Sequence, residues 1–168
     1  LYANKHLGMA ESEGVRLLTQ LSLLFVIFAL PAGLIGGKIG RRKTIAAGII
    51  ILGTCMLLMA VLPVNLLITL LFSLPVLGAV PVVGLILMVA GIGWALININ
   101  SLPMVVDLTD AVKIGTYTGL YYLFSTLAAI LGPNINGLFV EIAGGDYSVI
   151  MFIGPVFMLL ALVMIVGV

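Results

Sequence analysis

The sequence contains very little charge. Only 8% of its 168 residues are Asp, Glu, Lys or Arg, whereas 63% are apolar. A soluble domain usually has about 25% charged and about 45–50% apolar residues, so this composition cannot cover a water-exposed surface. The net charge of +1 leaves no basic face for nucleic acid. The composition therefore predicts a membrane protein and excludes a nucleic-acid partner.

Cysteine and histidine occur once each. Cys55 lies inside an apolar run and has no second cysteine to pair with, so we expect a buried thiol. His6 lies outside every apolar run and is expected to be solvated. One His and one Cys cannot supply the ligand cluster of a metal site or a Ser–His–acid triad. We therefore predict no metal, no cofactor and no catalytic residue, and we do not expect an enzyme.

Five apolar stretches are long enough to cross a membrane, because a helix needs about 20 apolar residues to cross about 30 Å of hydrocarbon. They cover residues 15–35, 44–62, 80–106, 115–142 and 148–168. The fourth is expected to open near Gly132 and Pro133, since proline removes a backbone donor, and a simple kink there is the alternative. Residues 65–79 are apolar but short and interrupted by Pro75 and Gly78, which favours a re-entrant or interfacial segment over a sixth crossing. The predicted fold class is an all-α membrane protein with five transmembrane helices.

Basic residues are concentrated between the first two predicted spans. Segment 36–43 contains Lys38, Arg41, Arg42 and Lys43. With five spans, these residues and Lys113 fall on one side of the membrane, whereas Lys5 and Arg16 fall on the other. The positive-inside rule then predicts that segment 36–43 is a cytoplasmic loop.

Polar side chains are concentrated in the third and fourth spans, whereas the second and fifth are almost wholly apolar and are predicted to lie peripherally, facing lipid. Polar groups inside a membrane are costly unless they face a bundle interior or a wet cavity. In the third span, Trp94, Asn98 and Ser101 share one helical face by their i, i+4, i+7 spacing. Asn100 and Asp107 share another face.

In the fourth span, a narrow arc of an ideal helix contains Thr118, Tyr121, Ser125 and Asn136. Amide, hydroxyl and aromatic groups together suit a polyhydroxylated ligand. The predicted substrate-binding residues are Trp94, Asn98, Ser101, Thr118, Tyr121 and Ser125. Hydrogen bonding between helices is the alternative role for the buried amides. The glycine pairs Gly91/Gly93 and Gly115/Gly119 are predicted to serve helix packing.

The segment Gly33-Leu-Ile-Gly-Gly-Lys-Ile-Gly-Arg-Arg-Lys-Thr-Ile45 resembles the cytoplasmic signature of the major facilitator superfamily, Gly-x-Leu-x-Asp-Arg-x-Gly-Arg-Arg/Lys. Gly37 stands at the aspartate position of that signature. Arginines in such a segment can bind helix C-terminal carbonyls and carboxylates, and so favour one conformation. The resemblance therefore predicts a conformational-switch loop, and a plain positive-inside anchor is the alternative. The matching residues are Gly33, Lys38, Gly40, Arg41 and Arg42.

The stretch from Gly93 to Gly137 is similar to helices ten and eleven of bacterial sugar carriers in the sucrose-transporter and glycoside–pentoside–hexuronide branch. This resemblance implies that the five spans are helices eight to twelve of a twelve-helix fold. Both ends of the sequence look cut, so we expect residues 1–168 to be a C-terminal bundle whose N-terminal half is missing.

The resemblance also implies a function. We expect a secondary active transporter in the bacterial cytoplasmic membrane that moves a small polar solute, a sugar above all, by alternating access. Its partners would be the solute, the lipid bilayer, the N-terminal half of the same chain and, in a symporter, a proton. No carboxylate lies deep in a span, so a coupling residue is expected in the missing half. A non-transporting receptor or a lipid-handling carrier on the same fold is the alternative.

Overall fold

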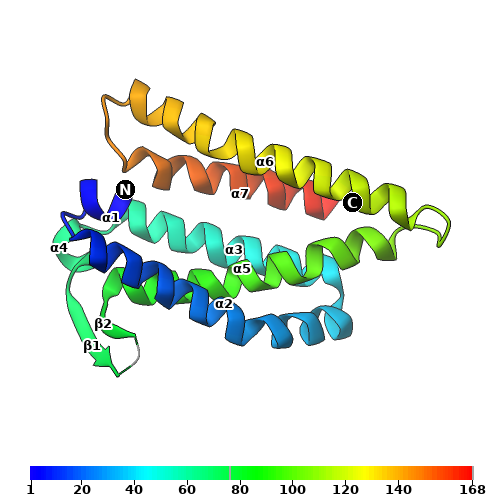
Figure 1. Cartoon of the computed structure of the whole chain (residues 1–168), viewed down its shortest axis with the longest axis horizontal. Helices are drawn as coiled ribbons and strands as arrows, with labels where there is room; N and C mark the ends of the chain where they lie inside the picture. Colours follow the sequence, from blue (N-terminus) through cyan, green and yellow to red (C-terminus); the bar gives the residue numbers. More distant parts are fainter. Residues whose placement is uncertain (76, 168) are drawn as a thin grey trace.

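A computed structural model describes residues 1–75 and 77–167 of the chain. The five long helices lie along the longest axis of the molecule, and each runs antiparallel to the long helix before it in the chain (Figure 1). These five helices are long and apolar enough to cross a membrane, which confirms the predicted number of spans. The elements in chain order are α1 (Tyr2–Lys5), α2 (Glu11–Ile39), α3 (Arg41–Val61), α4 (Val64–Leu67), β1 (Leu70–Leu74), β2 (Gly78–Pro81), α5 (Val82–Asp107), α6 (Ile114–Ile142) and α7 (Val149–Gly167).

The basic segment 36–43 is not a loop, which corrects the prediction. Helix α2 continues to Ile39 and α3 begins at Arg41, so a single residue, Gly40, separates them. Gly40 has a φ of +99°, a backbone conformation that residues with a Cβ rarely adopt. One glycine is therefore enough to reverse the chain, and the basic side chains extend from helix ends instead of a flexible connection.

Helix α6 is continuous through Gly132 and Pro133, so it does not open there, and of the two predicted outcomes only a kink remains. The helix includes Pro133 and continues to Ile142. Proline removes only its own N–H donor, and helices in membranes tolerate this loss when neighbouring groups satisfy the freed carbonyl.

Helix α5 is the centre of the bundle, with α2 on one side and α3 on the other (Figure 1). A Cβ on Gly91 would lie 2.3 Å from the carbonyl oxygen of Leu21 in α2. A Cβ on Gly48 of α3 would lie 2.6 Å from the carbonyl oxygen of Gly93. Small residues at these contacts let the backbones approach closely, which is a main source of helix association in membranes. The predicted packing role of Gly91 and Gly93 is confirmed.

The neighbours of α3 and α6 differ from the prediction. Helix α3 lies between α5 and α7 and buries residues such as Thr44 and Cys55, so it is not peripheral. Its composition could not show this, because an apolar side chain suits a neighbouring helix as well as lipid. Helix α6 was predicted to face the bundle interior, but among its described residues only Val140 is buried. Helix α7 has no buried residue and lies at the edge, as expected.

Residues 65–79 contribute to α4 and a β-hairpin. Strands β1 and β2 pair antiparallel, with Phe72 opposite Val80 and Leu74 opposite Gly78. A membrane-crossing strand needs about 9–11 residues, so strands of five and four residues do not form a sixth crossing. The hairpin projects sideways from the end of the bundle at which α2 begins (Figure 1).

Candidate functional site

A groove of about 480 Å³ lies between the C-terminal half of α5 and the N-terminal half of α6. It brings together three of the predicted substrate-binding residues, Ser101, Tyr121 and Ser125. The remaining lining residues are apolar or aromatic: Val105, Tyr117, Leu120 and Phe124. The groove therefore combines hydroxyl groups with flat aromatic walls.

The geometry of these side chains suits a hydroxylated solute. The hydroxyl of Ser101 donates to the carbonyl oxygen of Ile97 at 2.6 Å, which leaves its oxygen as an acceptor for a ligand. The ring of Tyr121 stands edge-on to that of Tyr122, with centroids 5.4 Å apart, and this contact restricts the ring that lines the groove. Hydroxyls can donate and accept, and aromatic faces cover the apolar side of a ring-shaped solute.

The other three predicted residues lie outside the lining of this groove. Trp94 and Asn98 are on the same α5 face as Ser101, closer to the N-terminus of the helix, and both are exposed. The Asn98 amide donates to the carbonyl oxygen of Trp94 at 3.3 Å. Thr118 is half-buried on α6. Their roles in binding stay predictions.

A buried polar network joins α5 to the junction between α2 and α3. Asn100 is 0% exposed. Its amide nitrogen donates to the carbonyl oxygens of Ala32 at 3.0 Å and Leu96 at 2.9 Å. Its amide oxygen accepts a hydrogen bond from the Nη1 of Arg41 at 3.0 Å. Every polar atom of this buried side chain therefore has a partner.

Arg41 is the centre of that network. Its Nη1 also donates to the carbonyl oxygen of Gly33 at 3.3 Å, near the C-terminal end of α2. Its Nε lies 3.6 Å from the Oδ2 of Asp107, at the end of α5. A cation next to helix C-terminal carbonyls is favourable, whereas the pair with the exposed Asp107 is weakened by solvent. The guanidinium thus contacts α2 and α5 from the first residue of α3.

The other residues of the basic segment have separate positions. Arg42 donates to the carbonyl oxygen of Val166 in α7. Lys38 is exposed in the last turn of α2. Gly36 was not among the predicted residues, yet a Cβ there would lie 1.7 Å from the Oδ1 of Asn100. The network therefore requires glycine at position 36.

Sequence reasoning grouped Asn100 with Asp107 and allowed for hydrogen bonding between helices, but it did not identify Arg41 as the partner of Asn100. It also missed Gln20. Gln20 in α2 is 0% exposed, and its amide nitrogen donates to the carbonyl oxygens of Leu77 at 3.2 Å and Ala79 at 2.9 Å. It is the one glutamine in the sequence and lies within an apolar span. A polar side chain at such a position needs a partner, and this signal could have indicated the attachment of the hairpin.

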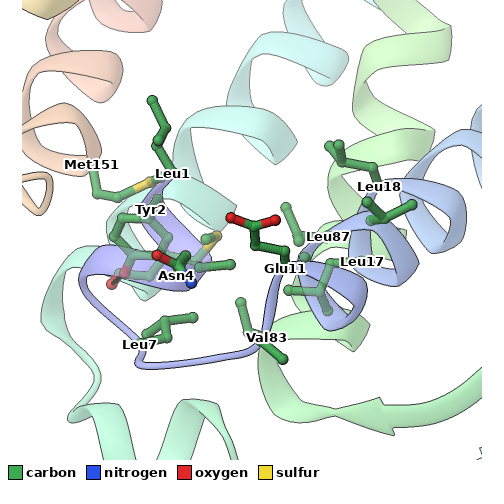
Figure 2. Close-up of a pocket in the computed structure, with 15 residues that line it drawn as sticks. Leu1, Tyr2, Asn4, Leu7, Glu11, Leu17, Leu18, Val83, Leu87 and Met151 are labelled. Carbon is green, nitrogen blue, oxygen red and sulfur yellow. Dashed lines mark hydrogen bonds between the residues drawn. The ribbon is translucent and has the colours of Figure 1, made fainter.

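A second cavity, of about 400 Å³, includes Val83 and Leu87 near the N-terminus of α5 and so lies at the opposite end of this helix from the groove. Figure 2 shows the residues that line it. Its lining is mostly apolar, and Tyr2, Asn4 and Glu11 are its polar side chains. The Tyr2 hydroxyl donates to the carbonyl oxygen of Met59, and the Asn4 amide donates to that of Met9. Burial, together with the charge of Asp146, raises the pKa of the Tyr2 hydroxyl. Tyr2 supplies the one hydroxyl among the described lining residues of this cavity, whereas Ser101, Tyr121 and Ser125 supply several to the groove, so the cavity suits a polyhydroxylated solute less well.

Comparison with known proteins gave one family-level result. The model described as Major Facilitator Superfamily matches residues 1–168. No curated protein and no solved structure matches the chain.

Proposed function

The chain belongs to the major facilitator superfamily, whose members are secondary transporters of small solutes rather than enzymes, and we propose that it is part of a carrier for a sugar. In this proposal, α2, α3, α5, α6 and α7 correspond to helices eight to twelve of a twelve-helix fold. An N-terminal half of the same protein would complete the solute pathway.

The observation that carries the sugar assignment is the groove between α5 and α6. Its volume of about 480 Å³ lies within the range of about 300–1,000 Å³ that is typical of small-molecule sites. Ser101, Tyr121 and Ser125 supply hydroxyls, and Tyr117 and Phe124 supply aromatic surface. A sugar offers both complementary features, several hydroxyl groups and an apolar ring face.

The distribution of charge supports an orientation. The α2–α3 junction and the α5–α6 connection, which carry five basic residues, lie at the same end of the bundle (Figure 1). Lys5 and Arg16 lie toward the other end. We assign the more basic end to the cytoplasm of a bacterium, following the positive-inside rule.

The network around Arg41 supports a role in alternating access. It links α3 to α2 and α5 through Gly33, Asn100 and Asp107. A carrier that alternates between two states needs contacts that differ between them, and ligand binding then shifts the populations. We assign the Arg41 contacts to the state in which α5 is held against the α2–α3 junction. A coupling proton would bind in the N-terminal half, because Asp and Glu in this chain lie at helix ends or in connections.

Uptake in cells that express the complete carrier tests this function. Tyr121→Phe removes a hydroxyl from the groove, and loss of one hydrogen bond should raise KM for the transported sugar by about 2- to 12-fold. Tyr122→Phe is the matched control, because Tyr122 is adjacent and does not line the groove. Asn98→Ala tests whether the polar α5 face beyond the groove also contacts the solute.

A screen for the substrate distinguishes a sugar from other solutes. A ligand at free concentration L that binds only the folded chain stabilises it by RT ln(1 + L/Kd), so the melting temperature rises as the ligand concentration increases above Kd. Stabilisation by sugars, and not by amino acids or nucleosides, would support the proposal. If no sugar stabilises the carrier or enters cells, or if Tyr121→Phe and Tyr122→Phe have the same KM, the sugar-binding groove is refuted.

A further inference from the structure

The hairpin between α3 and α5 has an unusual composition for a segment outside the helices. The chain contains no charged residue between Lys43 and Asp107, so the whole connection at this end of the bundle is uncharged. An edge strand exposed to water is normally protected by charged side chains, especially lysine. Strand β1, Leu-Leu-Phe-Ser-Leu, has none.

The two strands differ in their contacts. Every residue of β1 is exposed, and its apolar side chains include Leu70 at 59% and Phe72 at 43%. In β2, Val80 and Pro81 are buried, and Gln20 of α2 holds the backbone at Ala79. The hairpin is therefore attached to the protein along β2 and presents apolar side chains on both faces of β1. A patch of this kind in a soluble region marks a contact surface.

Two residues of α2 indicate the depth of the hairpin along the membrane normal. The side chain of Arg16 lies against Gly78, because a Cβ there would be 3.1 Å from both its Cδ and its Nε. Gln20, which binds Leu77 and Ala79, is one helical turn further into the span, about 6 Å. Charged side chains near helix ends lie at the level of lipid headgroups. The hairpin thus lies where the headgroup layer meets the hydrocarbon.

Backbone chemistry supports the same depth. The outer edge of β1 has N–H and C=O groups that β2 does not pair, and such groups cannot lie in the hydrocarbon core without partners. At the interface, water and headgroups can satisfy them while Leu and Phe side chains reach acyl chains. A hairpin surrounded by water would expose its apolar side chains, and a hairpin in the hydrocarbon core would leave backbone groups without hydrogen-bond partners.

We propose that the β1–β2 hairpin is an interfacial membrane anchor whose β1 side chains insert among the lipids of the leaflet opposite the basic α2–α3 junction. The anchor is joined directly to the first residue of α5 and is hydrogen-bonded to α2, so it sets the depth of these two helices in the bilayer. This inference depends on the membrane-spanning helices and not on the identity of the transported solute.

Fluorescence quenching in reconstituted carrier tests the anchor. The environment-sensitive dye NBD is attached to a cysteine introduced by Phe72→Cys, and Leu74→Cys provides a second position. Cys55 is 4% exposed, so it stays unlabelled in the folded protein, and a Cys55→Ala background confirms this. Leu160→Cys on the exposed side of α7 is the lipid control, and Val112→Cys between Asp110 and Lys113 is the water control. The membranes are single-copy nanodiscs of phosphatidylcholine, with or without brominated acyl chains, and aqueous iodide is the second quencher.

The anchor predicts that dye at positions 72 and 74 is quenched by brominated lipid, and that iodide quenches it several-fold less than dye at position 112. Quenching by iodide as strong as at position 112, without lipid quenching, would place the hairpin in water and overturn the proposal. Resistance to both quenchers would mean that protein covers β1, which also overturns it. In discs that hold several copies, loss of lipid quenching together with resistance to iodide would show that β1 pairs with a second copy. That result would overturn the anchor.

Discussion

Replacing Gly36 with alanine should uncouple α5 from the α2–α3 junction. The new Cβ would lie 1.7 Å from the Oδ1 of Asn100 and 3.2 Å from the Nη1 of Arg41. The first separation is far below any real contact between non-bonded atoms, so the Asn100 amide must move. Asn100 is 0% exposed and packed between α5 and the α2–α3 junction, so displacing its amide strains or breaks the three hydrogen bonds that it makes.

The expected cost can be worked out from these contacts. A hydrogen bond to a charged group contributes about 1.5–3 kcal/mol, and an interhelical bond in a membrane protein contributes about 0.6 kcal/mol on average. Alanine in a helix is better than glycine by up to about 1 kcal/mol, which offsets part of the loss. We therefore expect Gly36→Ala to lower the free energy of unfolding by about 1–3 kcal/mol.

Cys55 makes the measurement direct. It is the one cysteine in the sequence and is 4% exposed, so a thiol-reactive dye reports unfolding in detergent as the side chain becomes accessible. Gly37→Ala is the matched control. It changes the neighbouring residue of the same helix, and nothing lies within 4 Å of the Cβ it would add. That variant should be neutral or slightly stabilised.

A double-mutant cycle separates the clash from any general effect of alanine in α2. In an Asn100→Ala background the obstructing amide is gone, so Gly36→Ala should be neutral or stabilising. Equal stability of Gly36→Ala and Gly37→Ala would refute the reasoning. So would a Gly36→Ala penalty that persists unchanged in the Asn100→Ala background, because the penalty would then not come from Asn100.

The remaining contacts lead to three further expectations. Gln20→Leu removes two hydrogen bonds to the hairpin, each about 0.5–1.5 kcal/mol, so amide exchange in β2 should rise about fivefold or more while α7 is unaffected. Unchanged exchange would contradict this. Hydrogen bonds from Ser148 lower the pKa of the Asp146 carboxyl, so protection of the Ser148 amide should be complete above the ordinary Asp pKa and be lost as pH falls through the lower, folded value. In Asp146→Asn this acid transition should disappear, and its persistence would assign it to another group. Gly48→Ala should expose Cys55 to dye at a lower temperature than Gly119→Ala. The Cβ added at position 48 would meet the backbone of α5, whereas the Cβ added at position 119 would meet nothing within 4 Å. Equal temperatures would show that α3 can shift without cost.

Length and hydropathy predicted the five spans because these properties depend on single segments. The prediction that α3 is peripheral was wrong for the opposite reason. The contacts of this helix depend on which neighbour its apolar face meets, and lipid and protein both favour apolar side chains. The hairpin was missed since its residues are as apolar as those of a helix, and its strand pairing depends on contacts with Gln20, 57 or more positions earlier. The glycines show the same limit. Gly91 and Gly93 contact other helices, whereas no described atom lies within 4 Å of the Cβ positions of Gly115 and Gly119.

Helical spacing grouped the polar residues correctly but could not decide which face was buried. Trp94, Asn98 and Ser101 share one face of α5, and Asn100 and Asp107 share the face that meets Arg41. Periodicity alone treats both faces as equal. The residues that decide between the faces lie outside α5. Arg41 needs hydrogen-bond acceptors, and Gly36 leaves space for the Asn100 amide that supplies one.

These two faces connect the network to the groove. Asn100 and Ser101 are consecutive residues of α5, so their side chains point about 100° apart and their Cα atoms differ by about 1.5 Å along the helix axis. Any rotation or sliding of α5 that breaks the Asn100–Arg41 bond must therefore displace Ser101 by a similar amount. Among its described residues, α6 buries only Val140, so this helix is packed loosely. The α6 wall of the groove therefore need not move together with α5. The width of the groove thus depends on whether α5 is bound at the α2–α3 junction. In the proposed carrier, a solute that bridged Ser101 and Tyr121 would favour the α5 position that fits it.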